Sequence, residues 1–212
     1  PPASGGFFCR FAFGMEKRRG LLYNIEKGVC CAVKKLLIVV DYQNDFVSGA
    51  LGFPQAAALE ENICAKITAY RRAGDQVVYT MDTHGPNYPE TQEGKKLPVP
   101  HCLEGTEGWQ LYGRVRPLLE GCPMFRKPVF GSGELFAYLQ EHPFSSIELA
   151  GVVSNICVIS NAVLARTAQP EAEILVDAAC TASHDPALHE KALDVMAGLQ
   201  VSILHRDAPA GA

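Results

Sequence analysis

The sequence predicts an α/β fold with a doubly wound, mostly parallel six-stranded sheet and helices on both faces. Short apolar runs that fit buried strands alternate along the chain with segments of helical periodicity, which is typical of a parallel sheet covered by helices. The chain has 212 residues, of which 48% are hydrophobic. It is long enough for one sizeable core and short for two. We therefore expect a single three-layer domain over residues 34–212.

The first half of this domain begins with the clearest strand. The apolar run LLIVV at 36–40 predicts a central parallel strand that is buried on both faces. Residues 56–72 have the apolar spacing of a helix, which Gly74 ends. A second strand is expected at 76–81. An irregular stretch, 84–108, is rich in Pro, Gly and charge, and loops of this length are usually functional or disordered.

The second half repeats the alternation. We expect its strands at 124–127, 147–151, 173–177 and 201–204, and a short helix at 134–141. Another helix follows Cys157. Asp185 and Pro186 form an N-cap followed by proline at the first helical position, so the last helix runs from there to about Leu199.

Residues 1–33 differ from the rest because they have no steady period. The basic cluster at 17–19 precedes no apolar region suited to a secretory signal. We expect an atypical extension: a disordered leader, a short amphipathic appendage, or upstream sequence outside the natural protein. In the last case translation would start at Val33.

The charge and composition of the chain limit the classes of molecule that it is expected to bind. The net charge of −4 gives no electrostatic reason to expect nucleic acid or an anionic membrane, and no apolar run approaches the roughly 18 residues of a membrane span. The eight cysteines are scattered through apolar segments and form no CxxC pair. We therefore expect reduced thiols and a cytoplasmic protein.

Four chemically capable side chains fall at the carboxyl ends of predicted strands, where ligands bind in such sheets. They are Asp41, Asp82, Lys127 and Cys157. Cys157 would lie in the first turn of a helix, where the N–H groups favour an anion and should lower the pKa of the thiol. It is then a candidate nucleophile, although a buried cysteine is also an ordinary core residue.

A candidate metal site surrounds the second strand end. Asp82 and His84 form a D-x-H pair, and His101 follows in the long loop. These ligands suit zinc, iron or manganese, and fewer than four protein ligands leave positions for water. Glu90 is the expected fourth ligand, with Glu93 as the alternative. Otherwise both histidines would be loop hydrogen-bonders.

The order of the motifs along the chain resembles that of the isochorismatase-like cysteine hydrolases. The motifs are DYQNDF, DTH, PHC followed by GT-x-G, a lone lysine after an aromatic residue, and GVVSNICV. The nicotinamidase branch is the most similar, over Lys34 to about Asp207. The resemblance implies a catalytic triad of Asp41, Lys127 and Cys157. It also implies a metal site, a cis peptide bond between Val152 and Val153, and an oxyanion hole formed by the Val153 and Cys157 N–H groups. The metal ligands that it implies are Asp82, His84, His101 and Glu90.

The implied activity is hydrolysis of a small carboxamide to acid and ammonia through a cysteine thioester. Nicotinamide is the expected substrate, as in NAD salvage, with a divalent metal such as zinc as cofactor. A homo-oligomer is expected. The alternatives are a metal-independent cysteine amidohydrolase acting on an N-carbamoyl or ureido compound, and a non-catalytic binding domain. An isochorismatase-type ether hydrolase is disfavoured because that branch uses no cysteine nucleophile.

Two positions depart from the family pattern. Ser154-Asn155 stands where the family usually has Thr-Asp, and Pro98 stands where nicotinamidases often place an aromatic residue. Pro98 leaves the amide substrate open. We expect substrate contacts from Phe46, Val152 and Tyr88, with Trp109 as a further candidate for the missing aromatic wall.

Overall fold

The computed structural model describes residues 34–206 and, before them, 17–18, 21–24 and 29–32. Those short segments are strands β1 (Lys17–Arg18), β2 (Leu21–Asn24) and β3 (Val29–Ala32) of an antiparallel three-stranded sheet. They belong to a compact unit of their own, Pro1–Val33, separate from Lys34–Ala212. The expectation of a disordered or non-native extension otherwise falls on residues outside the described part.

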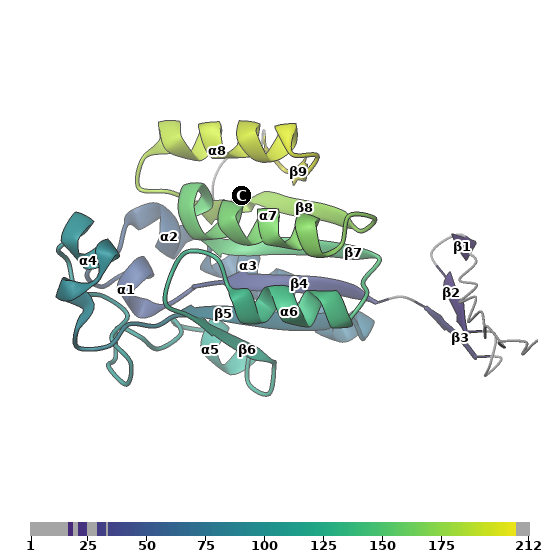
Figure 1. The fold of residues 1–212 in the computed structure, drawn as a ribbon, viewed down its shortest axis with the longest axis horizontal. Coiled ribbons are helices and arrows are strands. Elements are labelled where there is room, and N and C mark those ends of the chain that lie inside the picture. The colour runs from purple at the N-terminus through teal and green to yellow at the C-terminus, as the bar shows by residue number, and fades with distance from the viewer. Residues whose placement is uncertain (1–16, 19–20, 25–28, 33, 207–212) are drawn as a thin grey trace, which may run out of the picture. The chain divides into compact units, whose positions relative to one another are not determined.

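A six-stranded, wholly parallel sheet forms the centre of the second unit, which confirms the predicted fold class (Figure 1). Its strand order is β6-β5-β4-β7-β8-β9. The chain therefore starts in the middle of the sheet, builds one half outward, and returns to build the other. The strands are β4 (Lys35–Val40), β5 (Gln76–Asp82), β6 (Met124–Lys127), β7 (Ser146–Val152), β8 (Glu173–Ala182) and β9 (Ser202–Leu204).

The two faces of strand β4 contribute to two separate cores. Leu37 and Val39 pack with the helices on one face, whereas Leu36, Ile38 and Val40 pack with those on the other. All five side chains are fully buried, because successive residues of a strand point to opposite faces. The first core holds α3 (Glu60–Ala73) and α5 (Val115–Leu118). The second holds α6 (Gly133–Glu141), α7 (Ile159–Ala168) and α8 (Pro186–Gly198).

The predicted helix boundaries agree with the structure where a capping residue marks them. Gly74 ends α3 with a left-handed φ of 75°. The Asp185 carboxylate accepts hydrogen bonds from the N–H groups of Ala187 and Leu188 and so begins α8. The single helix predicted at 56–72 is divided in the structure between α2 (Pro54–Ala58) and α3. Four other short elements were not predicted: α1 (Asn44–Val47), η1 (Tyr88–Glu90), α4 (Gln92–Lys96) and α5.

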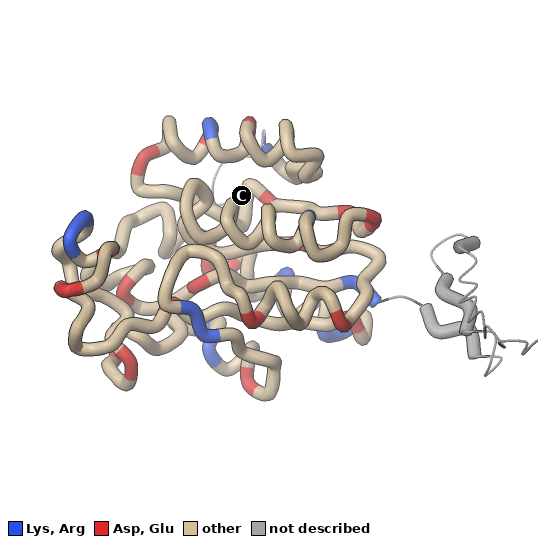
Figure 2. The backbone as a smooth tube through the Cα atoms, in the orientation of Figure 1, with Lys and Arg blue, Asp and Glu red and all other residues tan. Residues whose placement is uncertain are grey.

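The strand order fixes where a ligand would bind. Strands β4 and β7 are neighbours, but the chain leaves them toward opposite halves of the sheet, which opens a crevice beyond their carboxyl ends. Acidic and basic residues are interspersed over the domain (Figure 2). Within the described residues, no helix is long and apolar enough to cross a membrane.

Candidate active site

Lys127 lies at the centre of the strand-end residues. Its Nζ is 2.7 Å from Asp41 Oδ2, 3.0 Å from Asp82 Oδ1 and 3.5 Å from Cys157 Sγ. Asp41 follows β4, Asp82 and Lys127 end the adjacent strands β5 and β6, and Cys157 follows β7. The structure therefore brings together all four side chains that the sequence placed at this edge.

Asp41 is held in an unusual position. It is fully buried and has a left-handed φ of 45°, a conformation uncommon outside glycine, asparagine and aspartate. Thr80 donates a hydrogen bond to its Oδ1 over 2.7 Å. Burial raises the pKa of the Asp41 carboxyl above its ordinary value, although Lys127 opposes that rise. A raised pKa suits a carboxylate that must accept and return a proton.

The turn that carries Cys157 begins where β7 ends. The peptide bond between Val152 and Val153 is cis, as the resemblance implied. One turn of π-helix, η2 (Ser154–Val158), follows it, a form often found at functional sites. Its i→i−5 bonds start from the N–H of Val158. Val153 is the N-cap of this turn and Cys157 lies within it, at the end of a helix where the first N–H groups have no intrahelical partner.

Gly151 is required just before this turn. Its φ is 114°, and a Cβ there would meet the Val40 carbonyl oxygen at 2.1 Å. The chain can pass this close to β4 only without a side chain. Asn161 also donates a hydrogen bond to the carbonyl of Cys157 over 2.8 Å. The nucleophile candidate therefore has a fixed backbone.

The expected low pKa of Cys157 is wrong for this conformation. Burial raises the pKa of the thiol well above its ordinary value; Lys127 lowers it, but Asp41 and Asp82 raise it further. The sequence argument counted only the helix N-terminus and missed the desolvation of a side chain that is 5% exposed. A raised pKa favours the protonated thiol, and a protonated thiol needs a base to become a nucleophile.

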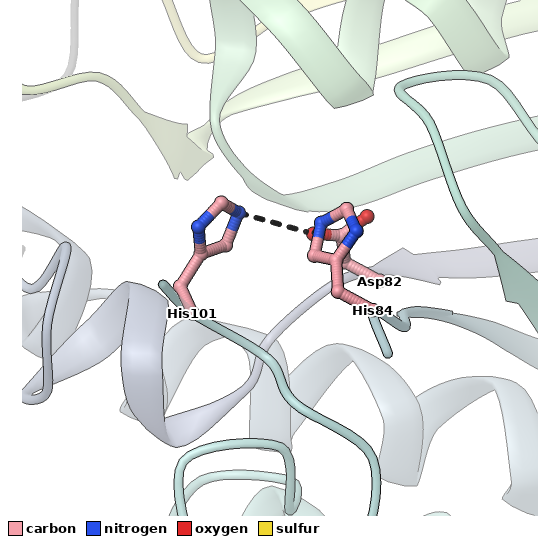
Figure 3. A group of neighbouring side chains, drawn as sticks. All are labelled: Asp82, His84 and His101. Atoms are coloured by element: carbon pink, nitrogen blue, oxygen red, sulfur yellow. Dashed lines mark hydrogen bonds and ion pairs between the residues drawn. The ribbon is translucent and has the colours of Figure 1, made fainter. Parts of the chain in front are cut away.

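A second cluster adjoins the first through Asp82. Both imidazole rings turn toward the Asp82 carboxylate (Figure 3): His84 Nε2 is 2.9 Å from Oδ2 and His101 Nε2 is 3.4 Å from it. One ligand atom from each of the three residues lies within 4.8 Å of the others, and all three residues are buried. The Val99 carbonyl is 2.9 Å from His101 Nδ1. A proton held there leaves Nε2 as a metal ligand.

The fourth possible ligand near these histidines is the carboxylate of Glu93. Its Oε1 is 3.9 Å from His84 Nε2 and 3.7 Å from His101 Nε2. Glu90, the residue first expected in this role, is exposed at the end of η1. The short helix α4 explains the difference, because it turns Glu93 inward while η1 leaves Glu90 outside. Burial raises the pKa of Glu93, as does the nearby Asp82 carboxylate.

The expected substrate contacts have different environments. Phe46 packs edge-on against His101, with ring centroids 5.4 Å apart. Tyr88 is fully buried; its ring lies 4.7 Å from that of His84 and 5.0 Å from that of His101. It supports the histidines from behind and offers no exposed surface in this conformation. Val152 is also fully buried.

Two further residues bear on the missing aromatic wall: Pro98, which stands where an aromatic residue was expected, and Trp109, a candidate to replace it. Pro98 is exposed. Trp109 Nε1 donates a hydrogen bond to Thr83 Oγ1 over 2.9 Å, which fixes the indole beside the end of β5.

Sequence reasoning missed three supporting residues: Thr80, Gln43 and Asn161. Thr80 could have been found, because it is two residues before Asp82 on β5 and so shares a face with it. Gln43 and Asn161 are fully buried and bond to backbone groups of the site. No sequence signal marks such contacts, because they depend on the path of distant segments.

Comparison with known proteins agrees with this geometry. The isochorismatase domain family model matches residues 35–207. An isochorismatase family protein of Bacillus subtilis, PncA, is 35% identical over 146 residues, which cover 62% of this chain and 78% of the relative. The crystal structure of nicotinamidase PncA from Bacillus subtilis superposes with a TM-score of 0.72 at 32% identity, covering 81% of this chain and all of that one.

Two further solved structures bear on the metal and the substrate. A pyrazinamidase of Pyrococcus horikoshii in complex with zinc matches at a TM-score of 0.71 and 25% identity, over 81% of this chain and 98% of its own. An N-carbamoylsarcosine amidase of Thermoplasma acidophilum matches at 0.68 and 26%, over 84% and 99%. The family model spans most of the chain, including every residue of the two clusters. The chain therefore belongs to the isochorismatase family, as its motifs predicted.

Proposed function

We propose that this protein is an amidohydrolase that converts nicotinamide to nicotinate and ammonia through a thioester on Cys157. One observation carries the proposal: Lys127 Nζ contacts both Asp41 Oδ2 and Cys157 Sγ at the crevice between β4 and β7. The similarity to nicotinamidases supports nicotinamide as the substrate. Conversion of nicotinamide to nicotinate would place the protein in NAD salvage.

The acylation step uses the three triad residues. Asp41 accepts the thiol proton while Cys157 Sγ attacks the amide carbon, forming the carbon–sulfur bond. Lys127 keeps its positive charge, because the adjacent carboxylates raise its pKa against the opposing effect of burial. It therefore balances the negative charge during proton transfer. The N–H groups of Val153 and Cys157 hold the oxyanion of the tetrahedral intermediate.

The remaining steps return the site to its starting state. Asp41 gives the proton to the departing nitrogen, ammonia leaves, and the thioester remains on Cys157. Water then attacks the thioester carbon with Asp41 as the base, and the thiol is released with its proton. Each proton taken by Asp41 is returned within the cycle.

We propose Asp82, His84, His101 and Glu93 as the metal-binding residues, with Glu93 in place of Glu90. The fit rests on the donor set, since two imidazoles and two carboxylates suit zinc, with iron or manganese as alternatives. A metal ion held there would act as a Lewis acid toward the pyridine nitrogen and orient the carboxamide. The Asp82 carboxylate is ready to bind a cation: burial would raise its pKa, but His101, His84 and Lys127 keep it well below its usual range.

The test is ammonia release by the purified protein from nicotinamide, pyrazinamide and N-carbamoylsarcosine, with elemental analysis of the same sample. We expect release from nicotinamide, a bound divalent metal, and loss of turnover in Cys157→Ala. Retained turnover in that variant would remove Cys157 from the mechanism. Release from N-carbamoylsarcosine alone, without metal, would favour the N-carbamoyl alternative. That alternative is less well supported, because it gives the Asp82, His84 and His101 cluster no purpose.

Two further features are proposed with the activity. A non-catalytic binding domain would have no use for three buried charged groups at a strand edge, so we propose an enzyme. We also propose a cytoplasmic homo-oligomer that acts on a small molecule rather than on nucleic acid or a membrane. Light scattering of the full chain would measure the oligomeric state.

A further inference from the structure

A cavity away from the candidate active site lies beside β5, and none of the triad or metal-cluster residues line it. Its volume is about 410 Å³, within the range of small-molecule sites. The floor is apolar: Met81 is 3% exposed and Leu119 1%. Trp109 also lines the cavity, with the Arg126 guanidinium 5.3 Å from its ring centroid, and the exposed residues Arg116 and Glu120 form the rim. The lining thus combines apolar side chains with two charged side chains, one donor and one acceptor, and with the polar side chains of Gln110 and Tyr79.

The chemistry of the rim selects a class of ligand. Arg116 can only donate hydrogen bonds and Glu120 can only accept them. Among the residues that the structure describes, neither side chain has an ion pair. A planar ring with an acceptor and a donor side by side would satisfy both, with its face on the apolar floor. A primary aromatic carboxamide and the amidine edge of adenine both have this arrangement.

The cavity is also linked to Asp82. Trp109 Nε1 donates to Thr83 Oγ1, and the Trp109 carbonyl accepts a hydrogen bond from Gln43 Nε2 over 2.9 Å. The Gln43 amide also holds both backbone groups of Asp82: Nε2 donates to the Asp82 carbonyl over 2.9 Å, and Oε1 accepts from the Asp82 N–H over 2.8 Å. A ligand that moves Trp109 would therefore move the backbone of Asp82.

We propose that this cavity is a second small-molecule site for a planar aromatic ligand with adjacent acceptor and donor groups, coupled to Asp82 through Trp109 and Gln43. The proposal goes beyond the proposed function and does not depend on turnover. Because the chain has one tryptophan, intrinsic fluorescence reports on the wall of this cavity.

The experiment titrates Cys157→Ala protein, which removes turnover, with benzamide and with adenosine. Fluorescence and isothermal titration calorimetry are read on the same sample, so binding without a spectral change is still detected. We expect saturable binding of one or both ligands, which also distinguishes the two sources of the shared chemistry. Arg116→Ala and Glu120→Ala should each weaken binding about fivefold or more, because each removes a charged hydrogen-bond partner.

Two matched controls sharpen the result. Arg72→Ala removes another exposed arginine, on α3, and should leave affinity unchanged. Acetophenone keeps the carbonyl but lacks the N–H, so its weaker binding should not respond to Glu120→Ala. Absence of binding for both ligands at millimolar concentration would overturn the site. Equal binding in both rim variants would overturn it too, by placing the ligand elsewhere.

The coupling has its own measurement. Zinc affinity of the Cys157→Ala protein, measured by chelator competition, should change about fivefold or more when the cavity is saturated, since coupling between sites is reciprocal. Gln43→Met should abolish this change. An unchanged zinc affinity would refute the coupling. No arm reads ammonia release, so a failure of the proposed activity would leave these results standing.

Discussion

Replacing Lys127 by methionine should remove both stability and activity. The lysine side chain is fully buried and ion-paired with Asp41 and Asp82. Removing one partner of a buried ion pair typically costs about 3–5 kcal/mol, because the remaining charge has lost its compensation. For a domain of this size each kcal/mol lowers the melting temperature by about 2–4 °C. We therefore expect Lys127→Met to melt about 6–20 °C below the wild type.

Lys66→Met is the matched control for that loss. Lys66 is also a mostly buried lysine with two carboxylate partners, Glu148 and Asp177, but it lies on α3 and its partners lie on β7 and β8. Both variants should lose stability, measured by calorimetry. Only Lys127→Met should lose ammonia release per folded molecule, assayed at low temperature where both remain folded. Unchanged melting in Lys127→Met, or full activity of its folded fraction, would refute the reasoning.

Three other substitutions separate roles around the site. Glu93→Gln should weaken zinc binding in chelator competition at least about 10-fold, whereas Glu90→Gln should not; the opposite result would restore Glu90 as the ligand. Thr80→Val removes a hydrogen bond that lowers the pKa of Asp41, so the acidic limb of the pH–rate profile should move to higher pH; an unmoved limb would count against Asp41 as the base. Burial alone would raise the pKa of the Asp177 carboxyl, but hydrogen bonds from Lys66 and His205 outweigh burial and lower that pKa. Its stabilisation is therefore complete above about pH 4 and fades below. The difference in unfolding free energy between wild type and Asp177→Asn should shrink there in urea titrations, and a constant difference would contradict this.

The fold could be predicted because its signals are local. The apolar run at 36–40 became the fully buried strand β4, and Gly74 and Asp185 ended or began helices as capping chemistry requires. Elements of four or five residues, such as α4 and α5, gave no such signal. They are too short for a helical period, and their formation depends on the loops that they join.

For the candidate site, the sequence could predict which residues lie at the ends of strands, and little more. The carboxyl ends of parallel strands lie at one edge of a sheet, and this rule alone predicts that Asp41, Lys127 and Cys157 lie together. The rule gives positions but not environments. It could not reveal that burial raises the pKa of Cys157. Nor could it separate Glu93 from Glu90, since the two short elements η1 and α4 decide which carboxylate faces inward.

The energetics of burial favour a functional explanation for this cluster. Buried ion pairs are often no more stabilising than apolar side chains of the same size, so Asp41, Asp82 and Lys127 are a costly way to fill the crevice between β4 and β7. Stability alone does not account for placing the thiol of Cys157 3.5 Å from that lysine. Proton transfer does, because the protonated thiol needs a nearby base and a fixed cation to balance the charge. Lys127 contacts Asp41 and Asp82 at once, so the candidate nucleophile and the candidate metal site form one electrostatic unit.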